Sequence, residues 1–247
     1  MPDSPYTSRS SVLLAVATGL FLVSAGGVLL SAQATVPGRT VWDAVYTDAQ
    51  AARGSQVFGQ SCNNCHTLSE QGNRPLSGPK FWEGWTQRTV GALLTFVSTN
   101  MPNGNGGSLA VPVYSDLVAL ILKSNGFPAG TIDLAAEAVA NVQIIPKDGP
   151  GELPANTLAR IVGCLARNGR DWALTNASVP ERIEKTGAVP EDATRALGDR
   201  TIALKFVLTR LDAFIGQRVA ATGILLGAGG ADGLNVSTVN RVGETCP

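Results

Sequence analysis

The chain contains one segment whose residue types and spacing can hold a cofactor, Cys62-Asn63-Asn64-Cys65-His66. In a C-x-x-C-H sequence the two thiols lie on one helical turn, where both can add to the vinyl groups of a single haem. The histidine that follows is then placed beneath the iron as its proximal ligand. His66 is also the only histidine in the sequence, which excludes bis-histidine ligation within one chain and a Ser-His-Asp triad. The motif predicts one covalently attached haem c.

Two other chemistries use a C-x-x-C sequence. A zinc ribbon needs a second thiol pair, but the next cysteine after Cys65 is Cys164, which stands alone. A thioredoxin-like site is expected in a βαβ context and has no use for the adjacent His66. Haem attachment is therefore the favoured interpretation.

Met101 is the methionine available as the second axial ligand. The other methionine, Met1, leaves with an export signal or lies in the membrane. Met101 follows a predicted helix and precedes Pro102 in a loop rich in glycine and asparagine, where a methionine has little core to fill. Thioether ligation opposite histidine raises the redox potential and leaves no coordination position open. This ligand pair predicts electron transfer rather than oxygen or peroxide chemistry.

Residues between the two ligands, and Phe58 just before them, are candidates for the surroundings of the haem. A ligating histidine donates its far ring N–H to an acceptor, and the carbonyl of Pro79 is the predicted acceptor for His66. Aromatic side chains are predicted to form the walls of the haem crevice, although ordinary core packing explains them equally well. They are Phe58, Phe81, Trp82 and Trp85.

The N-terminus is predicted to direct export. Arg9 precedes an uncharged run from Val12 to Leu30, which is followed by the cleavage pattern Ala32-Gln33-Ala34. Cleavage after Ala34 is the first interpretation, and retention of residues 12–30 as a single anchoring helix is the alternative, because the run is just long enough to span a bilayer. In either case the rest of the chain is expected in the periplasm.

The balance of charge limits the possible binding partners, and the remaining cysteines predict a disulfide. Nineteen basic residues balance nineteen acidic ones, which argues against a nucleic-acid partner. Cys164 and Cys246 remain after haem attachment, and in an oxidising compartment two such cysteines are expected to form a disulfide. Two free buried thiols are the alternative.

Helices are expected in the first half of the chain. Thr47 and Gln50 form a capping box before a helix from about Asp48 to Gln60. Gly54 inside that helix costs about 1 kcal/mol relative to alanine, and close approach of another helix is the natural reason for it. Further helices are predicted over 90–98, 116–124 and 134–142, the first two with Thr89 and Ser115 as N-caps.

The pattern changes at the turn-rich stretch 146–154. Beyond it the β-rich runs are 158–165, 171–175, 202–208, 218–226 and 234–242, with a short helical piece near 211–215. Asn168-Gly169 predicts a hairpin between the first two runs. These short strands predict a small barrel of the OB type.

Several segments carry a resemblance to a known family: 41–47, Ala49-Gln50, Arg53-Gly54, the C-x-x-C-H sequence, 76–79, Met101-Pro102, 107–109 and 121–128. Over residues 41–130 the chain resembles class I c-type cytochromes, in particular those that accompany quinoprotein (PQQ) dehydrogenases. The resemblance implies haem c, ligation by His66 and Met101, the Pro79 carbonyl on His66, and packing of the first helix across the third near Gly54. The chain departs from the family at Gly106, where a proline is usual.

The expected fold class is α+β in two domains, an all-α cytochrome c haem domain followed by a small OB-like β-barrel domain. The expected boundaries are 1–34 for the signal peptide or membrane anchor, 40–145 for the haem domain, 146–157 for the linker and 158–247 for the β domain. The expected function is that of a periplasmic monohaem electron carrier, itself not an enzyme. It would take single electrons from a dehydrogenase, of which a quinoprotein is the kind implied, and pass them to an oxidase or another cytochrome. The alternatives are an enzyme or small-ligand sensor with a labile Met101, and a docking or adaptor subunit of a dehydrogenase complex.

Overall fold

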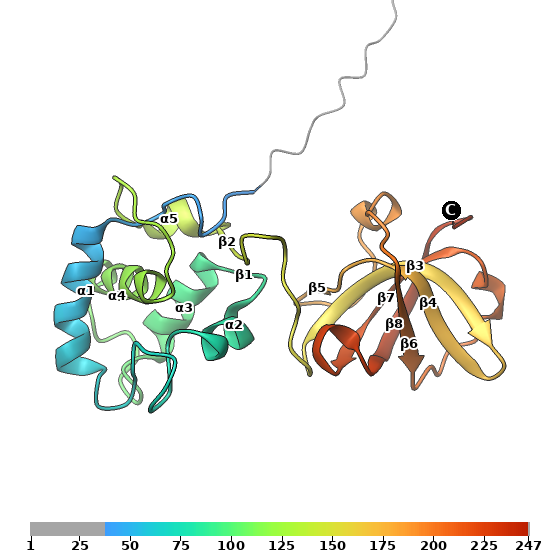
Figure 1. Cartoon of the computed structure of the whole chain (residues 1–247), viewed down its shortest axis with the longest axis horizontal. Helices are drawn as coiled ribbons and strands as arrows, with labels where there is room; N and C mark the ends of the chain where they lie inside the picture. The colour runs from blue at the N-terminus through green and yellow to red at the C-terminus, as the bar shows by residue number, and fades with distance from the viewer. Residues whose placement is uncertain (1–37, 247) are drawn as a thin grey trace, which may run out of the picture. The chain divides into compact units, whose positions relative to one another are not determined.

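The computed structural model describes residues 38–246. Figure 1 shows helices in the first half of these residues and mostly strands in the second. The predicted signal or anchor, residues 1–34, lies outside the described residues. Among those that are described, no helix is long and apolar enough to cross a membrane. The helices are α1 (Asp48–Ser61), α2 (Pro79–Trp85), α3 (Val90–Asn100), α4 (Val111–Ser124) and α5 (Ala136–Val139).

Helix α1 begins where the sequence predicts. The Oγ1 atom of Thr47 accepts a hydrogen bond from the N–H of Gln50 at 3.1 Å, which satisfies one of the free N–H groups at the start of the helix. The buried side chain of Gln50 has a different role from the one expected in a capping box. It donates to the carbonyl of Leu134 at 3.0 Å and accepts from the N–H of Leu134 at 2.7 Å. Gln50 thereby attaches α1 to the segment before α5.

Helices α1 and α4 pack against each other at Gly54. A Cβ atom on Gly54 would lie 2.1 Å from the carbonyl oxygen of Asp116, so the two backbones can approach only because no side chain intervenes. Next to this point, Arg53 Nη2 lies 2.9 Å from Asp116 Oδ1. Phe58, one turn further along α1, is buried in the core of the helical region. The close approach predicted from Gly54 is present.

Three helical segments differ from the sequence prediction. Helix α4 begins at Val111, because Pro112 fits the first helical turn, where its missing N–H has no partner to lose. Ser115 is buried inside this helix and does not cap it. The predicted helix over 134–142 is reduced to the single turn of α5. Helix α2 was not predicted; it begins with Pro79 after Gly78, which has a φ of +69°.

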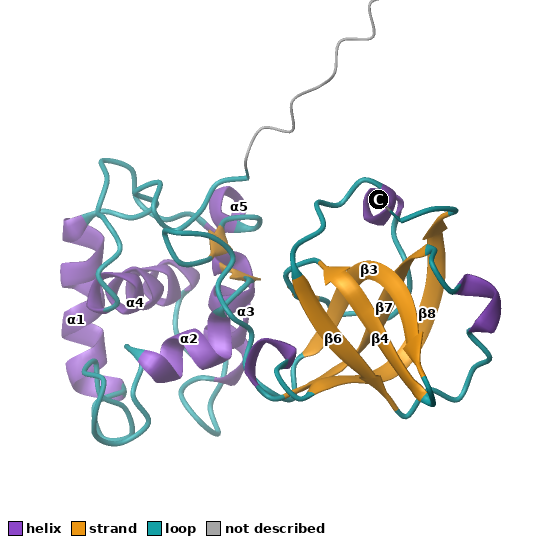
Figure 2. Cartoon of the chain, turned by 45° about the vertical axis from the view of Figure 1, so that its right-hand side comes forward, coloured by secondary structure: helices purple, strands orange, loops and turns teal. Residues whose placement is uncertain are grey.

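The second half of the described chain is built on one sheet. Its strand order is β4-β6-β8-β7-β3-β5, and β3 also pairs with β4, so the sheet closes on itself (Figure 2). The hairpin between β3 and β4 forms at Asn168-Gly169 as predicted, with Asn168 paired to Asp171. The strands are β3 (Leu158–Asn168), β4 (Asp171–Ala177), β5 (Glu181–Arg182), β6 (Arg200–Lys205), β7 (Arg218–Leu226) and β8 (Gly233–Gly243).

The predicted fold class is wrong. The sequence predicted an all-α haem domain followed by a small OB-like barrel, whereas about 29% of the structure is helical and a six-stranded sheet is its largest element. The helical region also contains an antiparallel pair, β1 (Arg88–Thr89) with β2 (Gln143–Ile144). Strands β3, β4 and β8 were predicted too short because pairing carries them past the apolar runs: polar Arg167 still pairs with Trp172. The predicted run 202–208 instead becomes β6, Arg200–Lys205.

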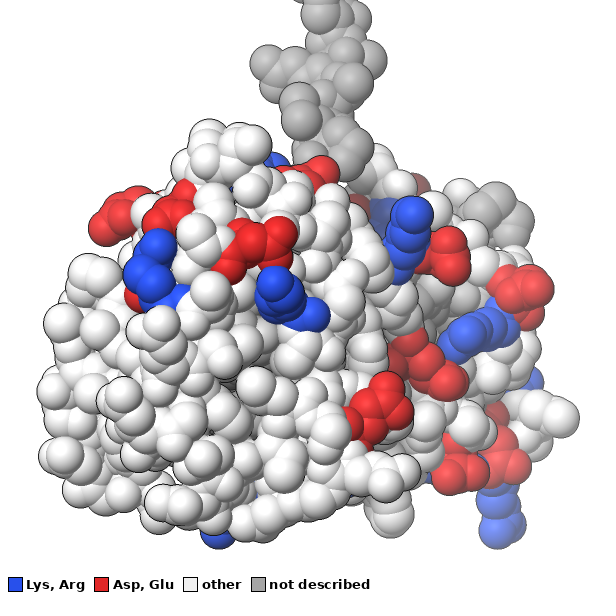
Figure 3. All heavy atoms as spheres, turned by 60° about the vertical axis from the view of Figure 1, so that its left-hand side comes forward, with Lys and Arg blue, Asp and Glu red and all other residues white. Residues whose placement is uncertain are grey.

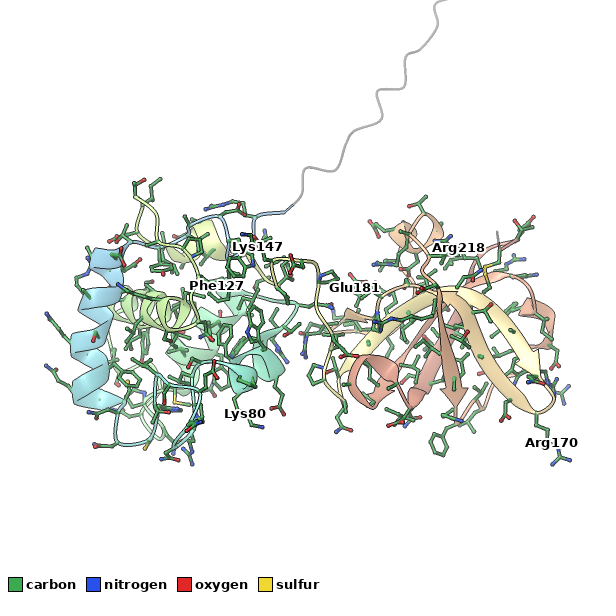
Figure 4. All side chains as sticks on the ribbon, viewed as in Figure 1. Lys80, Phe127, Lys147, Arg170, Glu181 and Arg218 are labelled. Atoms are coloured by element: carbon green, nitrogen blue, oxygen red, sulfur yellow. A yellow bond between two sulfur atoms is a disulfide. The ribbon has the colours of Figure 1, made fainter. Side chains whose placement is uncertain are left out.

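A disulfide and a buried ion cluster stabilise the β region. Cys164 in β3 is bonded to Cys246 beyond β8, with 5.5 Å between their Cα atoms, so the predicted disulfide is confirmed and the alternative of two free thiols is wrong. Asp192 is fully buried and faces Arg160, whose Nε lies 3.4 Å from its Oδ2. Arg218, labelled in Figure 4, donates to the main-chain carbonyl of Asp192 at 3.1 Å. The ion pair with Arg160 offsets part of the cost of burying the carboxylate, and the bond from Arg218 satisfies the main-chain carbonyl.

Candidate cofactor-binding site

The C-x-x-C-H sequence continues the C-terminal end of α1 as a compact turn. The N–H of Cys62 donates to the carbonyl of Phe58 at 2.9 Å. The N–H groups of Cys65 and His66 both donate to the carbonyl of Cys62, at 3.0 and 2.9 Å. Among the described residues the free cysteines are Cys62, which is partly buried, and Cys65, which is exposed. The end of helix α1 therefore positions two free thiols within one turn.

The ring of His66 is held by one hydrogen bond. Its Nδ1 atom lies 3.0 Å from the carbonyl oxygen of Arg74. Because a carbonyl can only accept, Nδ1 is the donor in this bond, and Nε2 is the ring nitrogen left to face a metal. The sequence predicted the Pro79 carbonyl in this role. The structure instead places Pro79 at the exposed start of α2 and brings the carbonyl of Arg74 to His66, through a backbone with φ of +41° at Arg74.

Met101 lies at the C-terminal end of α3. Its N–H donates to the carbonyl of Val97 at 3.0 Å, but its φ of −120° and ψ of +147° are extended, so the helix ends here. Pro102, which lacks an N–H, follows and prevents continuation of the helix. The side chain of Met101 is partly buried and lines the same cavity as the C-x-x-C-H turn.

This cavity has a volume of about 370 Å³ and brings together the predicted ligands from two distant segments of the helical region. Its walls come mainly from α1, α2, α3 and α4 and are predominantly apolar. Cys62, Cys65, His66 and Met101 all line it, whereas Pro79 does not. The apolar lining residues include Phe58, Leu76, Phe81, Trp85, Leu93, Phe96, Val97, Leu109, Leu117 and Ile121.

The predicted aromatic walls are partly found. Phe58, Phe81 and Trp85 line the cavity, while Trp82 packs away from it against Phe127, with 5.7 Å between the ring centroids. Phe127 is labelled within the helical region in Figure 4.

Two lining aromatic residues were missed by the sequence reasoning. Phe96 shares a face of α3 with Leu93 and Val97, a spacing that could have identified it. Tyr114 was missed because α4 was expected to start after it; Pro112 in the first turn was the available signal.

The electrostatics of the site are simple. Among the lining residues in the described part of the chain, the only charged side chains are Arg74 and Lys80. Lys80, labelled in Figure 4, has its Nζ atom 2.6 Å from Oε2 of Glu83, in an exposed pair of little energetic weight. Burial raises the pKa of the Cys62 thiol above its usual value, and the neighbouring Cys65 adds to the rise.

Comparison of the chain with models of protein families, with curated proteins and with solved structures finds no match.

Proposed function

We propose that the helical region binds one haem covalently through Cys62 and Cys65, with His66 and Met101 as axial ligands, and that the protein carries single electrons. One observation supports this most strongly. Two free cysteines, the only histidine and the only methionine of the described residues line one apolar cavity, although Met101 comes from a separate helix. Their donor atoms are the set that a His/Met c-type haem uses.

The cavity is suited to a haem by its volume and by the chemistry of its lining. Its volume of about 370 Å³ falls in the range of cofactor sites, which are concave and mostly apolar with few polar groups. Haem, when bound, supplies a one-electron couple between ferric and ferrous iron. The residues of this chain would hold it: the carbonyl of Arg74 fixes the ring of His66, and Met101 would supply a second ligand atom.

Apart from Arg74 and Lys80, the described residues that line the cavity include no Lys, Arg, Asp or Glu, which favours contact with a mostly uncharged partner surface. Neither segment that supplies the ligands, Gly54–Ser69 or Thr89–Ser115, contains a Lys, Arg, Asp or Glu residue. Figure 3 shows a broad face of the helical region without such side chains, below a group of charged ones. We propose a periplasmic protein that receives electrons from a dehydrogenase, of the quinoprotein kind that the resemblance implies, and passes them to an oxidase or another cytochrome. Such transient contacts are typically small.

Two other functions use parts of the same site. A disulfide-exchange protein needs a cysteine of lowered pKa, whereas burial raises that of Cys62. A haem enzyme or sensor with a labile Met101 would need groups that assist the chemistry. The described lining residues include no Asp, no Glu and no second histidine. Electron transfer therefore remains the better proposal.

The test is to produce the protein in cells that attach haem to exported C-x-x-C-H sequences and to compare wild type with Met101→Ala. The wild type should gain the mass of one haem and titrate at the high potential of a His/Met site. Met101→Ala should keep the haem, fall to a much lower potential and bind imidazole. Ser108→Ala, at an exposed position of the same loop that does not line the cavity, is the matched control and should resemble wild type. A wild-type protein with the mass of the bare chain, or with a low potential, would refute the proposal.

A further inference from the structure

The hydroxyl group of Tyr114 joins the two ends of the loop that carries Met101. Tyr114 lies in the first turns of α4 and is 2% exposed. Its OH donates to the main-chain carbonyl of Met101 at 2.8 Å and accepts from the N–H of Leu109 at 3.3 Å. Tyr114 also lines the cavity, as do Met101 and Leu109. One buried side chain thus contacts both the residue proposed as a ligand and the far end of its loop.

The middle of this loop is held separately, by backbone contacts. The N–H of Gly107 donates to the carbonyl of Ser98 at 2.8 Å, and that of Asn105 to the carbonyl of Pro102 at 2.8 Å. Gly106 lies so close to α3 that a Cβ atom there would be 2.1 Å from the carbonyl oxygen of Thr99. These contacts fix the shape of the loop, but none of them reaches Leu109. Leu109 is held near Met101 through the hydroxyl group of Tyr114.

We propose that Tyr114 is a positioning residue: its two hydrogen bonds keep the Met101 thioether facing the cavity and so close the site to small ligands. The inference rests on the proposed haem ligation by Met101. It deepens that proposal, because it names the group that decides between an electron carrier and a ligand binder. Phenylalanine at position 114 would keep the buried ring but leave the Met101 carbonyl and the Leu109 N–H without their partner. Loss of hydrogen bonds of this kind should raise the population of the open loop by roughly tenfold.

The experiment compares Tyr114→Phe with Tyr46→Phe in the haem-loaded protein. Tyr46 is the matched control: it is equally buried in the same region, and its OH donates to a main-chain carbonyl, that of Phe127, at 2.6 Å, but it does not line the cavity. Binding of imidazole to the ferric protein, followed by absorbance, should be roughly tenfold tighter in Tyr114→Phe, and its reduction potential should fall. Tyr46→Phe should bind imidazole as the wild type does.

Equal imidazole affinity in the two variants would overturn the inference. That result differs from failure of the proposed function, in which the wild type carries no haem, or binds imidazole as tightly as Met101→Ala does. If Tyr114→Phe does not fold, hydrogen exchange in the wild-type protein tests the inference instead. The Leu109 amide should exchange at least roughly tenfold more slowly, relative to its intrinsic rate, than the amide of exposed Gly104, because it donates to the Tyr114 hydroxyl. Equal protection of the two amides would refute the inference.

Discussion

At the scale of single residues, Tyr46 shows how burial changes acid–base behaviour in the helical region. Only 1% of its surface is exposed, and its hydroxyl donates to the carbonyl of Phe127. Burial raises the pKa of Tyr46 to about 12, and the nearby carboxylate of Asp48 adds to the rise. The neutral phenol is therefore favoured in the folded protein over the unfolded chain, where the group has its ordinary pKa.

A pH dependence of stability follows from this raised pKa. Between pH 10 and about 12 the unfolded chain loses the Tyr46 proton while the folded protein keeps it, so stability falls as the pH rises through that range. The slope contributed by this one group approaches ~1.4 kcal/mol per pH unit. Tyr46→Phe should be less stable at neutral pH by about 1 kcal/mol, because its hydrogen bond is lost, but should lack this slope. Urea unfolding at intervals from pH 8 to 12 measures both effects, and parallel curves for the two proteins would contradict the assignment.

Residue types alone predicted the side chains with donor atoms that meet at the cavity, but not all of its walls and not the partner that holds His66. His66 and Met101 could be chosen because the sequence offers few competitors, and both line the cavity. The carbonyl at His66 could not be predicted, because every residue carries one. Which carbonyl reaches the ring depends on the path of the loop, here on a left-handed backbone at Arg74 rather than on Pro79.

At the scale of elements, the crossing of α1 and α4 gives a sharp test at Gly54. Gly54→Ala should destabilise the protein by about 1–3 kcal/mol, because the new Cβ would clash with the backbone carbonyl of Asp116. Gly59 lies in the same helix, and a Cβ there would meet nothing within 4 Å. Gly59→Ala should therefore be neutral or stabilising by up to about 1 kcal/mol. Urea denaturation of the two variants measures the difference; equal effects would mean that the helices can separate at little cost.

Elements with strong local signals were predicted well, and those fixed by tertiary contacts were not. Helix α1 has its cap at Thr47, and β7 has the predicted bounds, because apolar periodicity and turn residues mark both ends. Helix α2 follows a glycine with positive φ, and β5 pairs with β3 through two residues only. Such elements exist because the surrounding structure supports them, so the local sequence carries little trace of them.

At the scale of the whole molecule, the described chain contains two separate clusters of buried apolar side chains. One extends from Val41 to Ile144 and the other from Leu153 to Leu234. The change of pattern near residue 146 marked the division between them. The closure of the sheet was harder to predict, since it depends on β3 pairing with both β4 and β7. Pairing between distant strands is a property of the assembled sheet and not of any one run of residues.

The disulfide lies in the β region that contains the second cluster, and its removal tests whether the helical and β regions unfold independently. Cys164 and Cys246 are 82 residues apart, so the bond restricts most of the β region in the unfolded chain. Replacing both with serine should destabilise that region by up to ~4.5 kcal/mol on the chain-entropy model. Hydrogen exchange in urea, resolved by peptide, should show earlier opening of β3 to β8 and unchanged protection of α1 and α4. If both regions lose protection together, they unfold as one cooperative unit, and the bond stabilises the proposed haem site as well.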